Sequence, residues 1–199
     1  TPTGGTIRGL HFGEDDGEPG APPAADLLNP QAVQAFLEET HERYAGSLSR
    51  WFGGVIIGFF TDEPSLTGRN AAPDVLPWTG GFLDEWRLAG LQETELPLPW
   101  LEAADSDRHL QVRCRYREQV ARRLDRTYYA ALSIWGGRHD LLLAGHPESS
   151  MDVGVQNRFG IPGQDLVWRW VAPEGDLALY GPHSTMAKST ADAARWAGK

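Results

Sequence analysis

The spacing of apolar residues along the chain predicts two long amphipathic helices. The first follows Asn29 and Pro30, a pair typical of a helix N-cap and first helical position. The second runs from about Val112 to Trp135 and has one apolar side. In the first helix, side chains recur at steps of three and four residues, at Val33, Phe36, Leu37, Thr40, Tyr44 and Leu48. The pairs Gly53-Gly54 and Gly136-Gly137 are expected to end these helices.

Two apolar runs without polar alternation, Val55 to Phe60 and Leu141 to Gly145, are typical of strands buried on both faces of a parallel sheet. Strands that alternate with helices predict the α/β class. We interpret residues 1–199 as a single (β/α) domain, in which the acidic, Pro/Gly-rich residues 13–25 form an exposed loop. Weaker patterns predict strands over residues 7–12 and 165–171, helices over 81–88, 149–158 and 184–197, and a long loop region over 65–107.

Composition excludes several classes of protein. The chain has 27 acidic and 18 basic side chains and a net charge of −9, so it lacks the basic surface that nucleic-acid binding needs. Its apolar runs fall far short of the roughly 20 residues that cross a bilayer. The single cysteine, Cys114, excludes an internal disulfide and a cysteine-only metal site, and favours a reducing compartment such as the cytoplasm. No cofactor is predicted.

Polar side chains follow the predicted strands where catalytic groups of parallel α/β proteins gather. Asp62 and Glu63 follow the first apolar run, and Arg169 and Trp170 lie near the end of the last predicted strand. A carboxyl group that is partly desolvated at such an edge has a raised pKa and can act as a general acid. Glu63 is therefore the candidate acid. The alternative is that Asp62 and Glu63 cap a turn and face water.

His146 and Glu148 follow the second apolar run, and they could contact a substrate hydroxyl, bind a metal or serve a structural role. His139 lies at the other end of that strand, about 20 Å away at roughly 3.3 Å per residue, so it cannot share a metal with His146. Trp78 could provide a flat platform for a sugar ring, with burial in the core as the alternative. We interpret the arginines of the second long helix as a solvated flank: Arg108, Arg113, Arg115, Arg117, Arg122, Arg123 and Arg126.

Five segments together resemble the catalytic-barrel region of large α-L-rhamnosidase-like glycoside hydrolases: Asp26–Pro30, Thr40–Tyr44, Phe60–Ser65, Gly145-His146 and Ser189–Ala194. The resemblance covers the chain from about Asp26 to its end. It implies a (β/α)₈ barrel, in which Glu63 matches the acid or acid/base carboxylate after one strand. His146 matches a substrate-contacting histidine after the next. The implied partner is a carbohydrate substrate, with no cofactor or metal.

We count about four strand–helix units, half of the eight that close such a barrel, so the resemblance implies an incomplete barrel. The second carboxylate that glycoside hydrolysis needs would follow a later strand, beyond Lys199. We therefore expect a piece of a longer hydrolase that is weak or inactive alone, a chain that pairs with another copy, or one in which Asp62 or Glu148 replaces the missing group. A non-catalytic carbohydrate-binding or assembly module and a metal-dependent hydrolase remain the alternatives.

Overall fold

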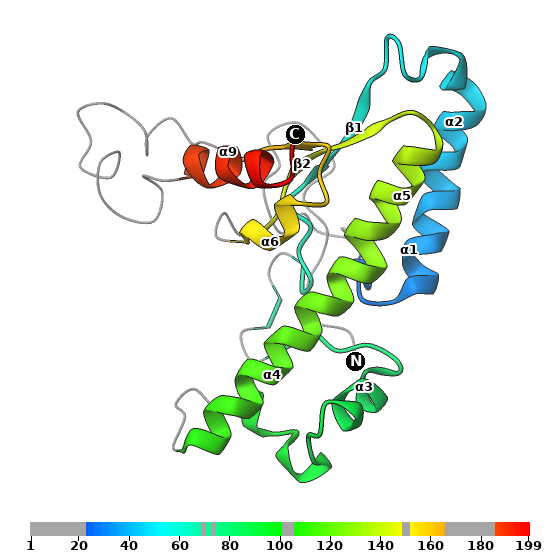
Figure 1. Cartoon of the computed structure of the whole chain (residues 1–199). Coiled ribbons are helices and arrows are strands. Elements are labelled where there is room, and N and C mark those ends of the chain that lie inside the picture. Colours follow the sequence, from blue (N-terminus) through cyan, green and yellow to red (C-terminus); the bar gives the residue numbers. More distant parts are fainter. Residues whose placement is uncertain (1–22, 69–70, 73–74, 101–105, 149–151, 166–185) are drawn as a thin grey trace. The chain divides into compact units, whose positions relative to one another are not determined.

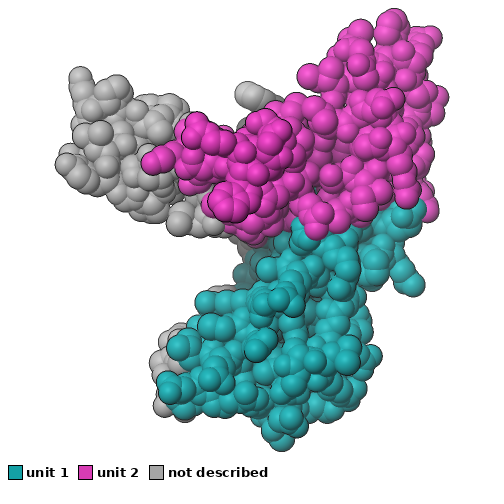
Figure 2. Space-filling model, in the orientation of Figure 1, with its two compact units in different colours: residues 1–36, 65–128 teal, residues 37–64, 129–199 magenta. Residues whose placement is uncertain are grey.

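The computed structural model describes residues 23–68, 71–72, 75–100, 106–148, 152–165 and 186–199. The chain divides into two compact units, shown in different colours in Figure 2. Unit 1 comprises residues 1–36 and 65–128, and unit 2 comprises residues 37–64 and 129–199. A single domain over residues 1–199 stays a prediction. Of the predicted loop 13–25, only residues 23–25 lie in the described part.

Unit 1 contains helices α1 (Pro30–Phe36), α3 (Phe82–Leu88) and α4 (Asp107–Leu124), with short 3₁₀ turns at Glu93–Glu95 and Leu98–Trp100. The predicted start of the first helix is confirmed, because the side chain of Asn29 accepts a hydrogen bond from the Gln31 N–H at 3.0 Å. Helix α4 begins before the predicted Val112. Its N-cap is Ser106, whose hydroxyl oxygen accepts from the His109 N–H at 3.1 Å.

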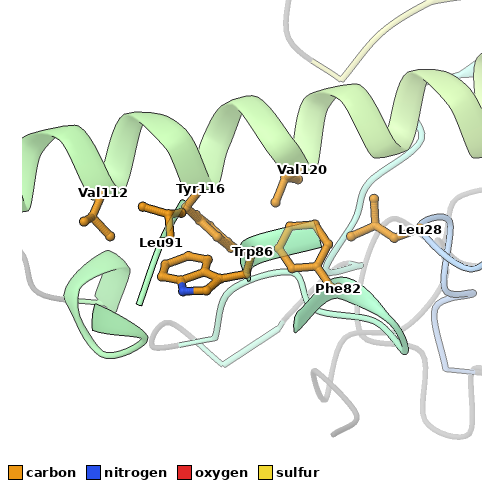
Figure 3. Close-up of a cluster of buried hydrophobic side chains, with 7 residues drawn as sticks. All are labelled: Leu28, Phe82, Trp86, Leu91, Val112, Tyr116 and Val120. Atoms are coloured by element: carbon orange, nitrogen blue, oxygen red, sulfur yellow. The ribbon is translucent and has the colours of Figure 1, made fainter. Parts of the chain in front are cut away.

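The core of unit 1 lies between α4 and α3 (Figure 3). Val112, Tyr116 and Val120 are spaced by four residues and project from one side of α4, as the apolar stripe predicts. They pack with Phe82 and Trp86 of α3 and with Leu28 and Leu91. The Tyr116 hydroxyl donates a 2.6 Å hydrogen bond to the Pro77 carbonyl, and burial raises the pKa of this phenol.

Arg123 corrects the interpretation of the α4 arginines. Arg122 is exposed and pairs with Glu118, but Arg123 is only 8% exposed. Its Nε donates to the Leu28 carbonyl at 2.8 Å and its Nη2 to the Gly80 carbonyl at 3.2 Å, while Nη1 pairs with Glu85 at 2.6 Å. The solvated interpretation was wrong for Arg123, which joins three segments of unit 1.

Unit 2 holds a parallel sheet of β1 (Gly58–Asp62), β2 (Leu142–His146) and β3 (Ile161–Pro162), in the order β1-β2-β3 (Figure 1). Its helices are α2 (Glu42–Leu48), α5 (Ala130–Arg138), α6 (Val153–Gln156) and α9 (Met186–Trp196). Both predicted long helices contain a π-helical turn, η1 (Leu37–His41) and η5 (Asp125–Tyr129). The 3₁₀ turn η2 (Ser49–Trp51) follows α2.

One face of this sheet is covered by η1 and α5. Phe59 of β1 lies with its ring centroid 5.1 Å from that of His41 and 5.5 Å from that of Trp135. The Trp135 indole donates a 2.7 Å hydrogen bond to Glu42, which ties α5 to α2, and the two helices lie side by side in Figure 1. Leu143 of β2 is buried. The opposite face carries Phe60, Leu142 and Ile161, which are exposed.

The prediction of barrel-type (β/α) units, forming an incomplete TIM-barrel-like domain, was wrong. Within the described residues the strands make a small open sheet in a mixed α/β structure, and β1 and β3 end it on opposite sides. Barrel closure requires the two edge strands to pair. Val55 and Ile57 lie before β1 and are exposed rather than buried in a strand. The described residues do not include the predicted strand over 7–12. Of the predicted strand over 165–171 they include Asp165 alone.

We expect His41 to make the stability of unit 2 depend on pH. Burial between aromatic rings lowers its pKa from the ordinary 6.5, against the smaller opposing effect of Glu42. Just below pH 6.5 the unfolded chain therefore binds more protons than the folded chain. The stabilisation from neutral His41 is present above pH 6.5, and it is lost as the pH falls from there towards the lowered pKa. We expect the free energy of unfolding to fall less on acidification in His41→Gln than in the parent. Urea titrations at pH 7.5 and 5.0 measure this difference, and equal losses would contradict it.

Candidate active site at the carboxyl ends of β1 and β2

Two carboxylates and one histidine meet at the carboxyl ends of β1 and β2. The parallel register pairs Asp62 with His146. The Nε2 atom of His146 lies 3.3 Å from Oδ1 of Asp62, and its Nδ1 atom lies 3.8 Å from Oε1 of Glu63. The imidazole therefore has a carboxylate beside each of its ring nitrogens.

The backbone of Glu63 explains how two consecutive carboxylates reach the same ring. Along a regular strand, neighbouring side chains point to opposite faces of the sheet. Glu63 has a φ of +40°, a conformation that non-glycine residues rarely adopt, and it breaks this alternation directly after the last residue of β1. Its N–H donates a 3.3 Å hydrogen bond to the His146 carbonyl, which fixes the turn to the end of β2. Strained backbone of this kind is common at functional sites.

Gly145 allows the close approach of β1 and β2 next to the site. Its φ is +132°, and a Cβ built there would lie 2.0 Å from the Thr61 carbonyl oxygen. Any other residue would strain the backbone and force the strands apart. The glycine therefore sets the position of His146 opposite Asp62.

The burial of the three side chains differs. The His146 side chain is 10% exposed, Glu63 is 36% exposed and Asp62 is 51% exposed. A neutral imidazole carries one N–H and a protonated imidazole carries two. Asp62, 3.3 Å from Nε2, is the nearer carboxylate, whereas Glu63, 3.8 Å from Nδ1, lies within ion-pair distance but not hydrogen-bond distance. The cluster can thus hold and orient a proton beside a carboxylate that reaches solvent, which is what general acid–base catalysis requires.

Phe60 is a neighbour of this site that the sequence interpretation missed. Its ring centroid lies 5.5 Å from that of His146, at an interplanar angle of 76°, and the residue is 63% exposed. The run Val55 to Phe60 predicted burial on both faces. The useful signal was the alternation of side chains along a strand, which places Phe60 and Asp62 on one face of the sheet and Phe59 on the other.

Two of the other predicted site residues, Glu148 and Trp78, are described by the structure and are not among the contacts of this cluster. Glu148 is exposed, two residues beyond the end of β2. Trp78 belongs to unit 1, where its ring packs edge-on against Phe82 with centroids 4.9 Å apart. Arg169 and Trp170 lie outside the described residues. His139 ends α5, where its ring stacks on Trp135.

Comparison with known proteins adds no further constraint. No family model, curated protein or solved structure matches this chain. The resemblance to α-L-rhamnosidase-like hydrolases therefore stays a prediction from the residues themselves.

Two other kinds of site are absent from the described part of the chain. No group of three or more His, Cys, Asp or Glu side chains there has an arrangement suited to a metal ion. None of its helices has both the length and the apolar character of a membrane span.

Proposed function

We propose that Glu63, Asp62 and His146 form an acid–base site for the hydrolysis of O-glycosidic bonds. The observation that carries the proposal is the convergence of two consecutive carboxylates on the two nitrogens of one buried imidazole, 3.3 and 3.8 Å away. The positive φ of Glu63 costs free energy, and a turn that only faces water would not need this strained conformation.

In the proposed reaction Glu63 is the general acid. Its carboxyl proton passes to the glycosidic oxygen as the bond from that oxygen to the anomeric carbon breaks. Water then supplies a hydroxyl group to the anomeric carbon and returns a proton to the site. His146, held between its two neighbours, acts as a positioning residue for the Glu63 carboxyl group.

Glycoside hydrolysis also needs a second carboxylate, which attacks the anomeric carbon or activates the water. Asp62 fills that role in our proposal because it lies beside the other ring nitrogen of His146 and is the more exposed of the two carboxylates. Carbohydrate is the substrate class, and the reaction needs no cofactor.

Substitution of Glu63 tests the proposal. We expect Glu63→Gln to lower the rate of hydrolysis of alkyl pyranosides by at least about 100-fold, because the amide cannot donate the proton. The matched control is Glu39→Gln, which removes a carboxylate of unit 2 that is 78% exposed and lies 3.7 Å from the guanidinium of Arg43. The control should keep the parent rate.

Two outcomes would contradict the hydrolase proposal. One is equal turnover by the parent and by Glu63→Gln. The other is pyranoside binding by the parent without any turnover, which would favour a carbohydrate-binding module.

A further inference from the structure

The exposed face of the sheet carries a row of apolar side chains next to the row that holds Asp62 and His146. The register places Phe60 beside Ala144, and Ala144 beside Ile161, so these three side chains share one face. Asp62 and His146 form the next row on the same face, two residues further along each strand. Phe60 and Ile161 are both exposed.

Phe60 presents its ring to solvent while an edge contact with His146 fixes its place. The contact has centroids 5.5 Å apart and nearly perpendicular rings, a favourable geometry for two aromatic groups. Phe59, the preceding residue, is held among the rings of His41 and Trp135 on the covered face. Phe59 therefore packs against the helices, whereas Phe60 lies at the surface beside the charged groups.

A pyranose ring has the matching chemistry. Its C–H faces are apolar and stack on aromatic rings, whereas its hydroxyls and ring edge need hydrogen-bond partners. The ring of Phe60 lies one row before two carboxylates and an imidazole, so this part of the sheet offers both kinds of contact. A protein partner would be expected to need a much wider apolar surface than this one row.

We propose that Phe60 is the platform on which the sugar ring next to the scissile bond stacks, so that its glycosidic oxygen comes to Glu63. This inference rests on the proposed function and adds the substrate-positioning residue and the face of the sugar that is recognised. It requires a pyranoside with an unobstructed C–H face.

Binding measurements separate this role from catalysis. The probes are methyl α- and β-pyranosides, titrated against the full chain and followed by NMR of the ¹⁵N-labelled backbone amides of β1 and β2. We expect Phe60→Leu to weaken binding about fivefold to tenfold and Phe60→Trp to keep or strengthen it, because the ring rather than its hydrophobicity makes the contact. Leu142→Ala is the matched control. It shortens another exposed apolar side chain of the same sheet face and should leave the affinity unchanged.

The results distinguish failure of this inference from failure of the proposed function. Unchanged affinity in Phe60→Leu, or an equal loss in Leu142→Ala, would overturn the platform, even if Glu63→Gln still abolishes turnover. A loss of affinity confined to Phe60→Leu, in a parent chain that shows no turnover, would keep the platform and reject the hydrolase. Absence of pyranoside binding by the parent would overturn the platform outright.

Discussion

Gly145→Ala is expected to unfold the sheet of unit 2. The substitution adds a Cβ that would lie 2.0 Å from the Thr61 carbonyl oxygen, at a residue whose φ is +132°. The backbone strain and the overlap each cost about 1–3 kcal/mol, and neither can relax without separating β1 from β2. We expect the free energy of unfolding to fall by at least about 3 kcal/mol. Urea denaturation measures the loss, and hydrogen exchange of the β1 and β2 amides locates it.

Gly137→Ala is the control for this prediction. Gly137 lies in α5, and a Cβ built there has no neighbouring atom within 4 Å. Alanine in a helix is favoured over glycine by roughly 0.5–1 kcal/mol, so this variant should be as stable as the parent or slightly more stable. A Gly145→Ala protein that keeps the parent's stability and exchange protection would show that the described pairing of β1 with β2 is incorrect.

Arg123→Met is expected to destabilise unit 1 by about 3 kcal/mol. Methionine keeps an apolar stem of similar length, but the carbonyls of Leu28 and Gly80 lose their donors. Glu85 keeps one partner, because Arg126 also pairs with it at 2.7 Å. The expected loss is therefore at the lower end of the range for breaking a buried ion pair.

The neighbouring arginine provides the control. Arg122 is exposed and pairs with Glu118 one helical turn away, a contact of at most about 0.5 kcal/mol. Arg122→Met should therefore shift the denaturation midpoint little. Similar losses in the two variants would contradict the view that Arg123 holds the segments of unit 1 together.

The start of the first long helix and the buried side of the second could be predicted from the sequence because their signals are local. The predicted end at Gly136-Gly137 was wrong, since α5 continues through both glycines to Arg138. Asn29 and Pro30 mark the start of α1, and the side chains four residues apart at Val112, Tyr116 and Val120 mark the buried side of α4. The role of Arg123 could not be predicted in this way. Its partners Leu28 and Glu85 are far away in sequence, so only the folded unit shows that its charge is paired.

The strands were predicted less well, because an apolar run does not specify its conformation or its partner. The run Val55 to Phe60 predicted a strand buried on both faces, whereas β1 starts at Gly58 and only one of its faces is covered. The barrel interpretation followed from the resemblance and from a count of about four strand–helix units, and it was wrong because the described strands form a small open sheet. The strand ends were still a useful guide, since Asp62, Glu63 and His146 do meet there.

Neither the turn at Glu63 nor the open face of the sheet could be predicted from the sequence. The positive φ of Glu63 brings two consecutive carboxylates to one imidazole, although strand alternation would separate them. The exposure of Phe60 depends on which face the helices cover, and this is a property of unit 2 as a whole.

The dependence of the rate on the leaving group tests the acid role of Glu63 most directly. A good leaving group such as dinitrophenolate departs without a proton, whereas an alkoxide needs one. We predict that Glu63→Gln hydrolyses a dinitrophenyl pyranoside at close to the parent rate and loses at least about 100-fold on the methyl pyranoside. An equal loss on both substrates, or no loss on either, would contradict the assignment of Glu63 as the general acid.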